Sequence, residues 1–300
     1  MSDNGGNEEV HKFLRSAGFS EFQTKQEIQE LLNRLIKESG ETLQFQINSE
    51  KLCQVKIEAA PELGICIVGE KKENEELDVE YYFPYLTGEE ITSTAECSIQ
   101  RHTERETYAG LLDEYRVGIS LIFYICNSIE YRIRRQKRES YQVKAAHLSG
   151  FSVKGKILLP IQKTAVQIEQ SKIASRTRSS LLEAAKNGDA DAIDTLTIED
   201  IDLYSQVTRR AQKEDLYSII DSCFMPCGIE CDQYSVIGEI KHIEYKENRF
   251  TGEKVYDLTL ESCDLIFHVG INEKDLTGEP KIGRRFKGQI WMQGIVDFKE

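Results

Sequence analysis

The sequence predicts an α+β protein in which N-terminal helices pack on a mainly antiparallel sheet, a helical connector follows, and a small antiparallel β-barrel or sandwich ends the chain. Three observations predict this class. Apolar residues alternate with a period of two in several stretches between 43 and 99 and again in 256–271, as in half-buried strands. Residues 24–36 and 180–220 follow helical spacing instead. Most successive strands of the first half have no long helical pattern between them, which favours antiparallel pairing.

The chain of 300 residues is longer than one average core supports, so we expect two domains and a connector. The predicted units are an unstructured tail at 1–9, an α+β domain at 10–165, a helical connector at 166–223 and a β-barrel-like domain at 224–300.

The α+β domain opens with helices. Thr24 and Glu27 have the spacing of a capping box, in which each side chain satisfies a free backbone amide of the helix. The helix after them has one apolar face, which we expect to pack on the sheet that follows. Two continuously apolar runs, Gly64 to Gly69 and Val117 to Cys126, are predicted as central strands covered on both faces.

The connector is predicted to be a pair of helices. Ser180 and Glu183 offer a second capping box, the first helix ends near Gly188, and Asp189 caps the next one. Residues 197–200 resemble a further N-terminal cap. The pattern resembles the helical hairpin of ankyrin-type repeats, but one copy is not an array, so we expect a single helix pair.

The junction between the connector and the second β region holds three of the eight cysteines, Cys223, Cys227 and Cys231. On an unbroken helix this spacing would place three thiols on one face, as in a metal site. Pro226 and Gly228 interrupt such a helix. We therefore predict no metal and no cofactor here, and interpret the stretch as a hinge whose reduced thiols pack as small apolar side chains.

Charge and hydropathy disfavour several classes of partner. The formal net charge is −13, which disfavours nucleic acids and anionic membrane surfaces, because both attract excess basic residues. The longest apolar run is about half of the ~20 residues that span a bilayer. The N-terminus has no basic region followed by an apolar core, so we expect no secretory signal and a cytoplasmic location.

A first basic cluster follows the apolar run that ends at Cys126. Arg132, Arg134 and Arg135 lie in the segment YRIRRQKRE, and they are candidates for binding a phosphorylated ligand or an acidic partner. The alternative interpretation is a solvated surface segment without a ligand.

A second cluster lies in the segment GRRFKGQIWMQG. There Arg284 and Arg285 alternate with aromatic residues that include Trp291, the single tryptophan, as in barrels that bind single-stranded nucleic acid. Residues 222–300 nevertheless carry more acidic than basic side chains, so a nucleic-acid role is weakly supported. Trp291 is also interpreted as a core residue or an interface anchor.

Three segments of the chain resemble a known family: HKFLRSAGFS, YAGLLDEYRVGISLIFYICN, and LLEAAKNGDADAIDTLT through FMPCGIECDQYSVIGEI. The family is an uncharacterised domain of unknown function from Gram-positive anaerobic bacteria. The resemblance extends over nearly the whole chain from Val10. It implies a bacterial cytosolic protein and no established activity. The family pattern has an aromatic residue where this chain has Cys227, which weakens the three-thiol metal site.

No nucleophile elbow, phosphate-binding loop or pair of metal-binding histidines occurs in the sequence. We therefore expect a non-enzymatic cytosolic protein that binds a protein or small-molecule partner. The first alternative is an enzyme or a sensor of small anions with a cleft between the two domains. The second is single-stranded nucleic-acid binding by the C-terminal barrel.

Overall fold

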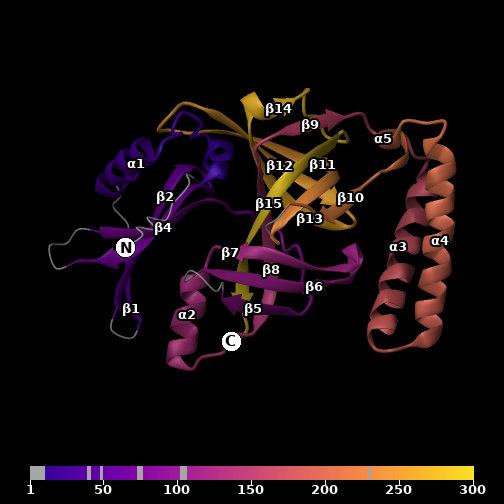
Figure 1. Ribbon diagram of the computed structural model, residues 1–300, viewed down its shortest axis with the longest axis horizontal. Coiled ribbons are helices and arrows are strands. Elements are labelled where there is room, and N and C mark those ends of the chain that lie inside the picture. Colours follow the sequence, from indigo (N-terminus) through magenta and orange to yellow (C-terminus); the bar gives the residue numbers. More distant parts are fainter. Residues whose placement is uncertain (1–10, 39–41, 48–49, 73–76, 102–106, 229–230) are drawn as a thin grey trace, which may run out of the picture.

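The computed structural model describes residues 11–38, 42–47, 50–72, 77–101, 107–228 and 231–300. Figure 1 shows a small sheet with its helices at one side, a large sheet in the middle and a helical hairpin at the other side. The α+β class is confirmed, since helices pack beside two sheets in which most strand pairs are antiparallel.

The N-terminal helices are η1 (Lys12–Ala17) and α1 (Lys25–Glu38). The predicted capping box is confirmed, because the backbone N–H of Glu27 donates to Thr24 Oγ1 and the Glu27 carboxylate accepts from the N–H of Thr24. Of the apolar residues predicted to form one face of α1, Ile28, Leu31, Leu32 and Leu35 are buried and Ile36 is partly buried.

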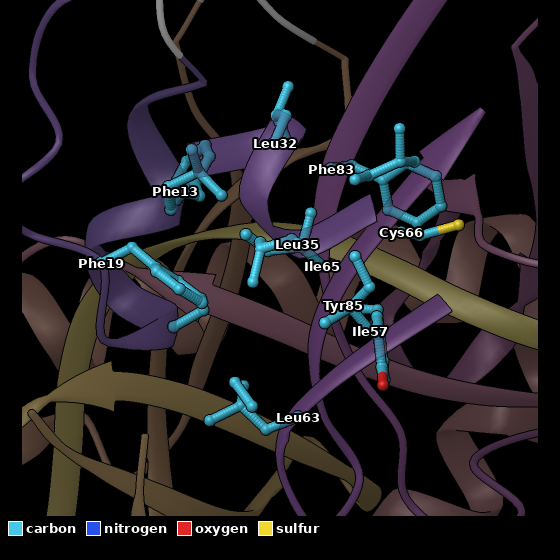
Figure 2. Packing of buried hydrophobic residues seen from close by; sticks show 14 of the residues in the cluster. Phe13, Phe19, Leu32, Leu35, Ile57, Leu63, Ile65, Cys66, Phe83 and Tyr85 are labelled. Atoms are coloured by element: carbon cyan, nitrogen blue, oxygen red, sulfur yellow. The ribbon is translucent and has the colours of Figure 1, made fainter. Parts of the chain in front are cut away.

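The four-stranded sheet is antiparallel throughout. Its strands pair in chain order: β1 (Thr42–Ile47), β2 (Glu50–Ala60), β3 (Leu63–Lys71) and β4 (Leu77–Leu86). Figure 2 shows Leu32 and Leu35 of α1 facing Ile65, beside Phe13 and Phe19. The first seven residues of β3 are all buried, as predicted for a central strand covered on both faces.

The large sheet takes strands from both halves of the chain. Its strands are β5 (Cys97–Arg101), β6 (Tyr108–Glu114), β7 (Ile119–Ile125), β8 (Val143–Ser152), β9 (Gly155–Leu158), β10 (Cys223–Pro226), β11 (Gln233–Glu247), β12 (Lys254–Ser262), β13 (Leu265–Asn272), β14 (Leu276–Thr277) and β15 (Arg285–Phe298). Short helices interrupt it at η2 (Tyr115–Val117), α2 (Ser128–Lys137) and η3 (Glu273–Asp275).

Five of these strands form a ring of pairings: β11 pairs with β12, β12 with β13, β13 with β8, β8 with β15, and β15 with β11. The closed barrel of the sequence analysis stays a prediction. The pairings do show that β8, which precedes the helical connector, lies between two strands that follow it. Strands from both sides of the predicted domain limits at 165 and 224 therefore pair in one hydrogen-bonded sheet. The domain limits also stay a prediction.

The helical connector consists of α3 (Ala165–Lys186), α4 (Ala190–Ala211) and the short α5 (Leu216–Ile219). The turn between α3 and α4 is as predicted, since Gly188 has φ +88° and the Asp189 carboxylate accepts from two amides of α4. We call α3 and α4 the helical arm. Figure 1 shows it extending along one side of the large sheet, far from the four-stranded sheet.

Two other predicted caps in the arm are wrong. Ser180 lies inside α3, and its hydroxyl donates to the carbonyl of Arg176; Thr197 lies inside α4 and donates to the carbonyl of Ile193. Such back-bonding satisfies a Ser or Thr hydroxyl within a continuous helix. The capping box of α3 is instead at Thr164.

Candidate functional site

The arginines of the first basic cluster lie on α2 but do not converge on one point. Arg132 is buried, with 9% of its surface exposed. Arg134 donates from Nε to Glu130 Oε1 at 3.0 Å, and its guanidinium lies 5.1 Å from the ring centre of Phe298. Arg135 lies over the ring of Tyr131. The part of these three arginines in ligand binding stays a prediction.

The second cluster is divided between different partners. Arg284 is partly exposed and donates to the carbonyl of Glu279. Trp291 is 5% exposed, donates from Nε1 to Asp232 Oδ2 at 2.7 Å, and stacks on Phe13 with ring centres 5.4 Å apart. Trp291 thus lies where η1 packs on the large sheet, as expected of a core anchor.

Arg285 is 4% exposed and binds backbone carbonyls. Its guanidinium donates to the carbonyls of Leu159, Tyr217 and Ile220 at 2.6–3.0 Å. Burial lowers the pKa of this guanidinium, although nearby Asp221 opposes the change. Leu159 precedes the helical connector and Tyr217 lies at its end, so Arg285 joins both ends of the connector to β15.

A polar cleft of about 680 Å³ lies between α3 and the strands β11–β13. It has three basic residues in its lining, Lys163, Lys241 and Arg285. Lys163 binds Asp221, Lys241 binds Glu239 and Glu261, and Arg285 binds carbonyls. Carboxylates and carbonyls of the protein already neutralise or accept from these cations. The cleft therefore has little positive charge left to attract an anionic ligand.

A charge network around a buried lysine, which the sequence patterns did not predict, lies between the two sheets. The ammonium of Lys246, whose side chain is 1% exposed, lies 2.9 Å from Glu244, 3.3 Å from Glu62 and 3.4 Å from Asp257. Burial lowers the pKa of Lys246, but the bond to Glu244 and the carboxylate charges outweigh it, so the pKa is raised. In the sequence, this network corresponds only to two charged residues, Lys246 and Asp257, whose positions on β11 and β12 are buried.

These three carboxylates are also a group that has metal-ligand spacing among the described residues. The Lys246 ammonium lies within ion-pair distance of all three carboxylates, so the protein itself places a cation at this group. Cys223, Cys227 and Cys231 form no such group within the part of the chain that the structure describes.

The helical arm exposes many large apolar side chains. On α4 the exposed fractions are 47% for Ile193, 60% for Ile201 and 75% for Tyr204, and these residues share one face with Thr197. We call these four residues the arm stripe. The residues of α4 that are buried, Ala192 and Leu196, lie on a different face. Single exposed apolar residues are ordinary, but a continuous patch marks an interaction surface.

Acidic residues surround the arm stripe. The segment from Asn187 to Thr208 contains six Asp and Glu and no Lys or Arg. Helical geometry places Asp194 and Asp200 on opposite sides of the stripe. Arg178 of α3 binds Asp200, whereas Asp194 has no ion pair among the described residues. The stripe is therefore an apolar strip with an acidic border.

No helix among the described residues is long and apolar enough to cross a membrane. The family model described as "Domain of unknown function, E. rectale Gene description (DUF3881)" matches residues 14–294. The match confirms the resemblance that the sequence segments carry. No curated protein and no solved structure matches the chain.

Proposed function

We propose that this chain, which belongs to the family of unknown function DUF3881, is a non-enzymatic binding protein whose helical arm docks a basic amphipathic helix of a partner protein. The arm stripe is the observation that supports the proposal. Burying the side chains of Ile193, Ile201 and Tyr204 would supply several kcal/mol, at roughly 1.5–3 kcal/mol for each large apolar side chain.

The charges on α4 favour a basic partner. Complementary charge speeds association and rejects partners of like charge. A second copy of the chain that packed its arm stripe against this one would bring two acidic borders together, which costs free energy. A helix with Leu or Ile on one face and Lys or Arg beside them matches both the apolar and the charged part of the surface.

The test uses the full chain and a fluorescent helical peptide of Leu and Lys at heptad spacing. We expect the peptide to bind, and an otherwise identical peptide of Leu and Glu not to bind. The variant Ile201→Ser should weaken binding at least tenfold because it removes an apolar contact and keeps the charge. Ile282→Ser is the matched control, since Ile282 is 68% exposed and lies outside the arm.

Two outcomes would overturn the proposal. Equal loss of affinity in both variants would mean that the peptide binds exposed apolar residues without preference for the arm. If light scattering shows that the chain is a dimer and Ile201→Ser abolishes the dimer, the arm stripe binds a second copy of the chain instead.

A further inference from the structure

The four-stranded sheet has two covered faces, and the second one is incompletely filled. One face packs on η1 and α1. The other faces α2 and β15, and there a cavity of about 350 Å³ remains. Its floor is a row of side chains across three paired strands, Lys56 on β2, Cys66 on β3 and Phe83 on β4. Cys66 and Phe83 lie side by side in Figure 2.

The opposite wall of this pocket comes from α2 and β15. Ile129 and Ile133 lie one helical turn apart on α2, and Ile295 projects from β15. Most of the lining is apolar, and the volume is at the lower end of the ~300–1,000 Å³ that is usual for small-molecule sites. Such a cavity fits a small ligand with an apolar body.

The thiols in the wall are neutral. Burial raises the pKa of Cys66 to about 11, against smaller opposing effects of Gln54 and Lys56. Burial also raises the pKa of Cys126. At neutral pH both thiols are therefore protonated and uncharged, and each has a glutamine partner, Gln54 for Cys66 and Gln293 for Cys126.

Two charged residues line the pocket, and only one is neutralised by the protein. Glu130 accepts from Arg134 Nε at 3.0 Å and from Asn127 Nδ2 at 3.1 Å. Lys56 is exposed, and its ammonium lies 4.3 Å from the ring centre of Tyr85. No carboxylate among the described residues forms an ion pair with Lys56. Its charge is available at the solvent side of the pocket.

We infer that this pocket binds a small amphiphile that has a carboxylate head, with the apolar body between Phe83 and α2 and the head at Lys56 Nζ. The combination of an apolar cavity and a single cation at its edge is the arrangement that recognises such a molecule. The inference does not depend on the helical arm.

The probe is decanoate, with decan-1-ol as the uncharged comparison. In full-length protein labelled at the isoleucine δ1 methyl groups, decanoate should shift the NMR signals of Ile129, Ile133 and Ile295. The signals of Ile282 and Ile201, which are exposed elsewhere, should stay unchanged. Lys56→Met should weaken the binding of decanoate at least tenfold and leave the binding of decan-1-ol unchanged, since it removes the charge-assisted hydrogen bond to the carboxylate head.

The control for this substitution is Lys254→Met, because Lys254 is also an exposed lysine over a tyrosine ring, that of Tyr245, but lies on β12. This variant should bind decanoate normally. Absence of shifts at the lining isoleucines, or shifts at Ile201 alone, would overturn the site. Equal binding of decanoate and decan-1-ol, with no effect of Lys56→Met, would overturn the carboxylate assignment.

Discussion

His268 should make the stability of this protein depend on pH above neutrality. Its Nδ1 lies 2.9 Å from Asp257 Oδ1 and its Nε2 lies 2.6 Å from Glu90 Oε2, so two carboxylates hold one imidazole. Burial lowers the pKa of His268, but the hydrogen bonds and charges of Asp257 and Glu90 outweigh it and raise the pKa to about 9. The folded protein therefore keeps the imidazole protonated at neutral pH.

The sign and size of the effect follow from this shift. Below a pH of about 6.5 both folded and unfolded His268 are protonated, so the stabilisation is fully present. It is lost as the pH rises through 9, because the unfolded imidazole releases its proton first. A pKa raised from 6.5 to about 9 is equivalent to about 3 kcal/mol, which the half-exposed carboxylate of Glu90 reduces to about 2 kcal/mol.

Urea unfolding of the wild type and of His268→Gln would measure this contribution. We expect the wild type to be more stable at about pH 6 and the difference between the two proteins to shrink by about 2 kcal/mol at about pH 9.5. Comparing the two proteins cancels the titration of the cysteines, which both contain. A difference that is the same at both pH values would refute the reasoning.

Three further predictions concern stability. Lys246→Met should lower the free energy of unfolding by about 2 kcal/mol, because it removes the buried ammonium beside the buried carboxylate of Asp257, which then keeps only His268 as an ion-pair partner among the described residues, and Lys241→Met at an exposed ion pair by less than about 1 kcal/mol; similar losses in urea titrations would contradict this. Arg138→Gly should raise the free energy of unfolding by roughly 0.5–1 kcal/mol, because Arg138 is exposed and has φ +58°, which favours glycine; a lower melting temperature of the variant would argue against this. Replacing 165–211 with a short Gly-Ser linker should leave a cooperatively folding chain by near-ultraviolet circular dichroism, since Arg285 holds both ends of the connector; loss of the signal would contradict this.

Local signals in the sequence predicted local structure well. Thr24 and Glu27 form their capping box because both partners lie within one turn of the chain. The same spacing at Ser180 and Glu183 misled, because a hydroxyl inside a helix can donate to the carbonyl four residues earlier. The spacing of a capping box does not distinguish a helix start from a helix interior when the helical pattern of apolar residues continues before and after it.

Pairing between distant strands was not predictable in the same way. Residues 143–152 form β8, and nothing in their sequence identifies β13 and β15 as its neighbours. Those neighbours are set by non-local packing of both sheet faces. The two halves of the sequence were therefore interpreted as separate β regions, although the pairings join them in one sheet.

The charged residues show the same limit. The sequence pattern marks Arg285 as a candidate for binding a ligand and gives Lys246 no distinctive signal, yet both residues are buried. A buried cation needs acceptors, and those of Arg285 are carbonyls of residues 159, 217 and 220, which lie far away in the sequence. Backbone acceptors have no signature in residue type, so these contacts become visible only in the folded chain.

The Arg285 contacts with Leu159 and Tyr217 also determine which part of the chain can vary in length and sequence. They hold the entry and exit of the connector at one guanidinium, so the segment between them can lengthen, shorten or vary without moving the strands of the ring. Long insertions between fixed ends cost little free energy. The helical arm is thus a place where the chain can tolerate changes of length and sequence while the sheets stay the same, and where a foreign helical hairpin can be grafted.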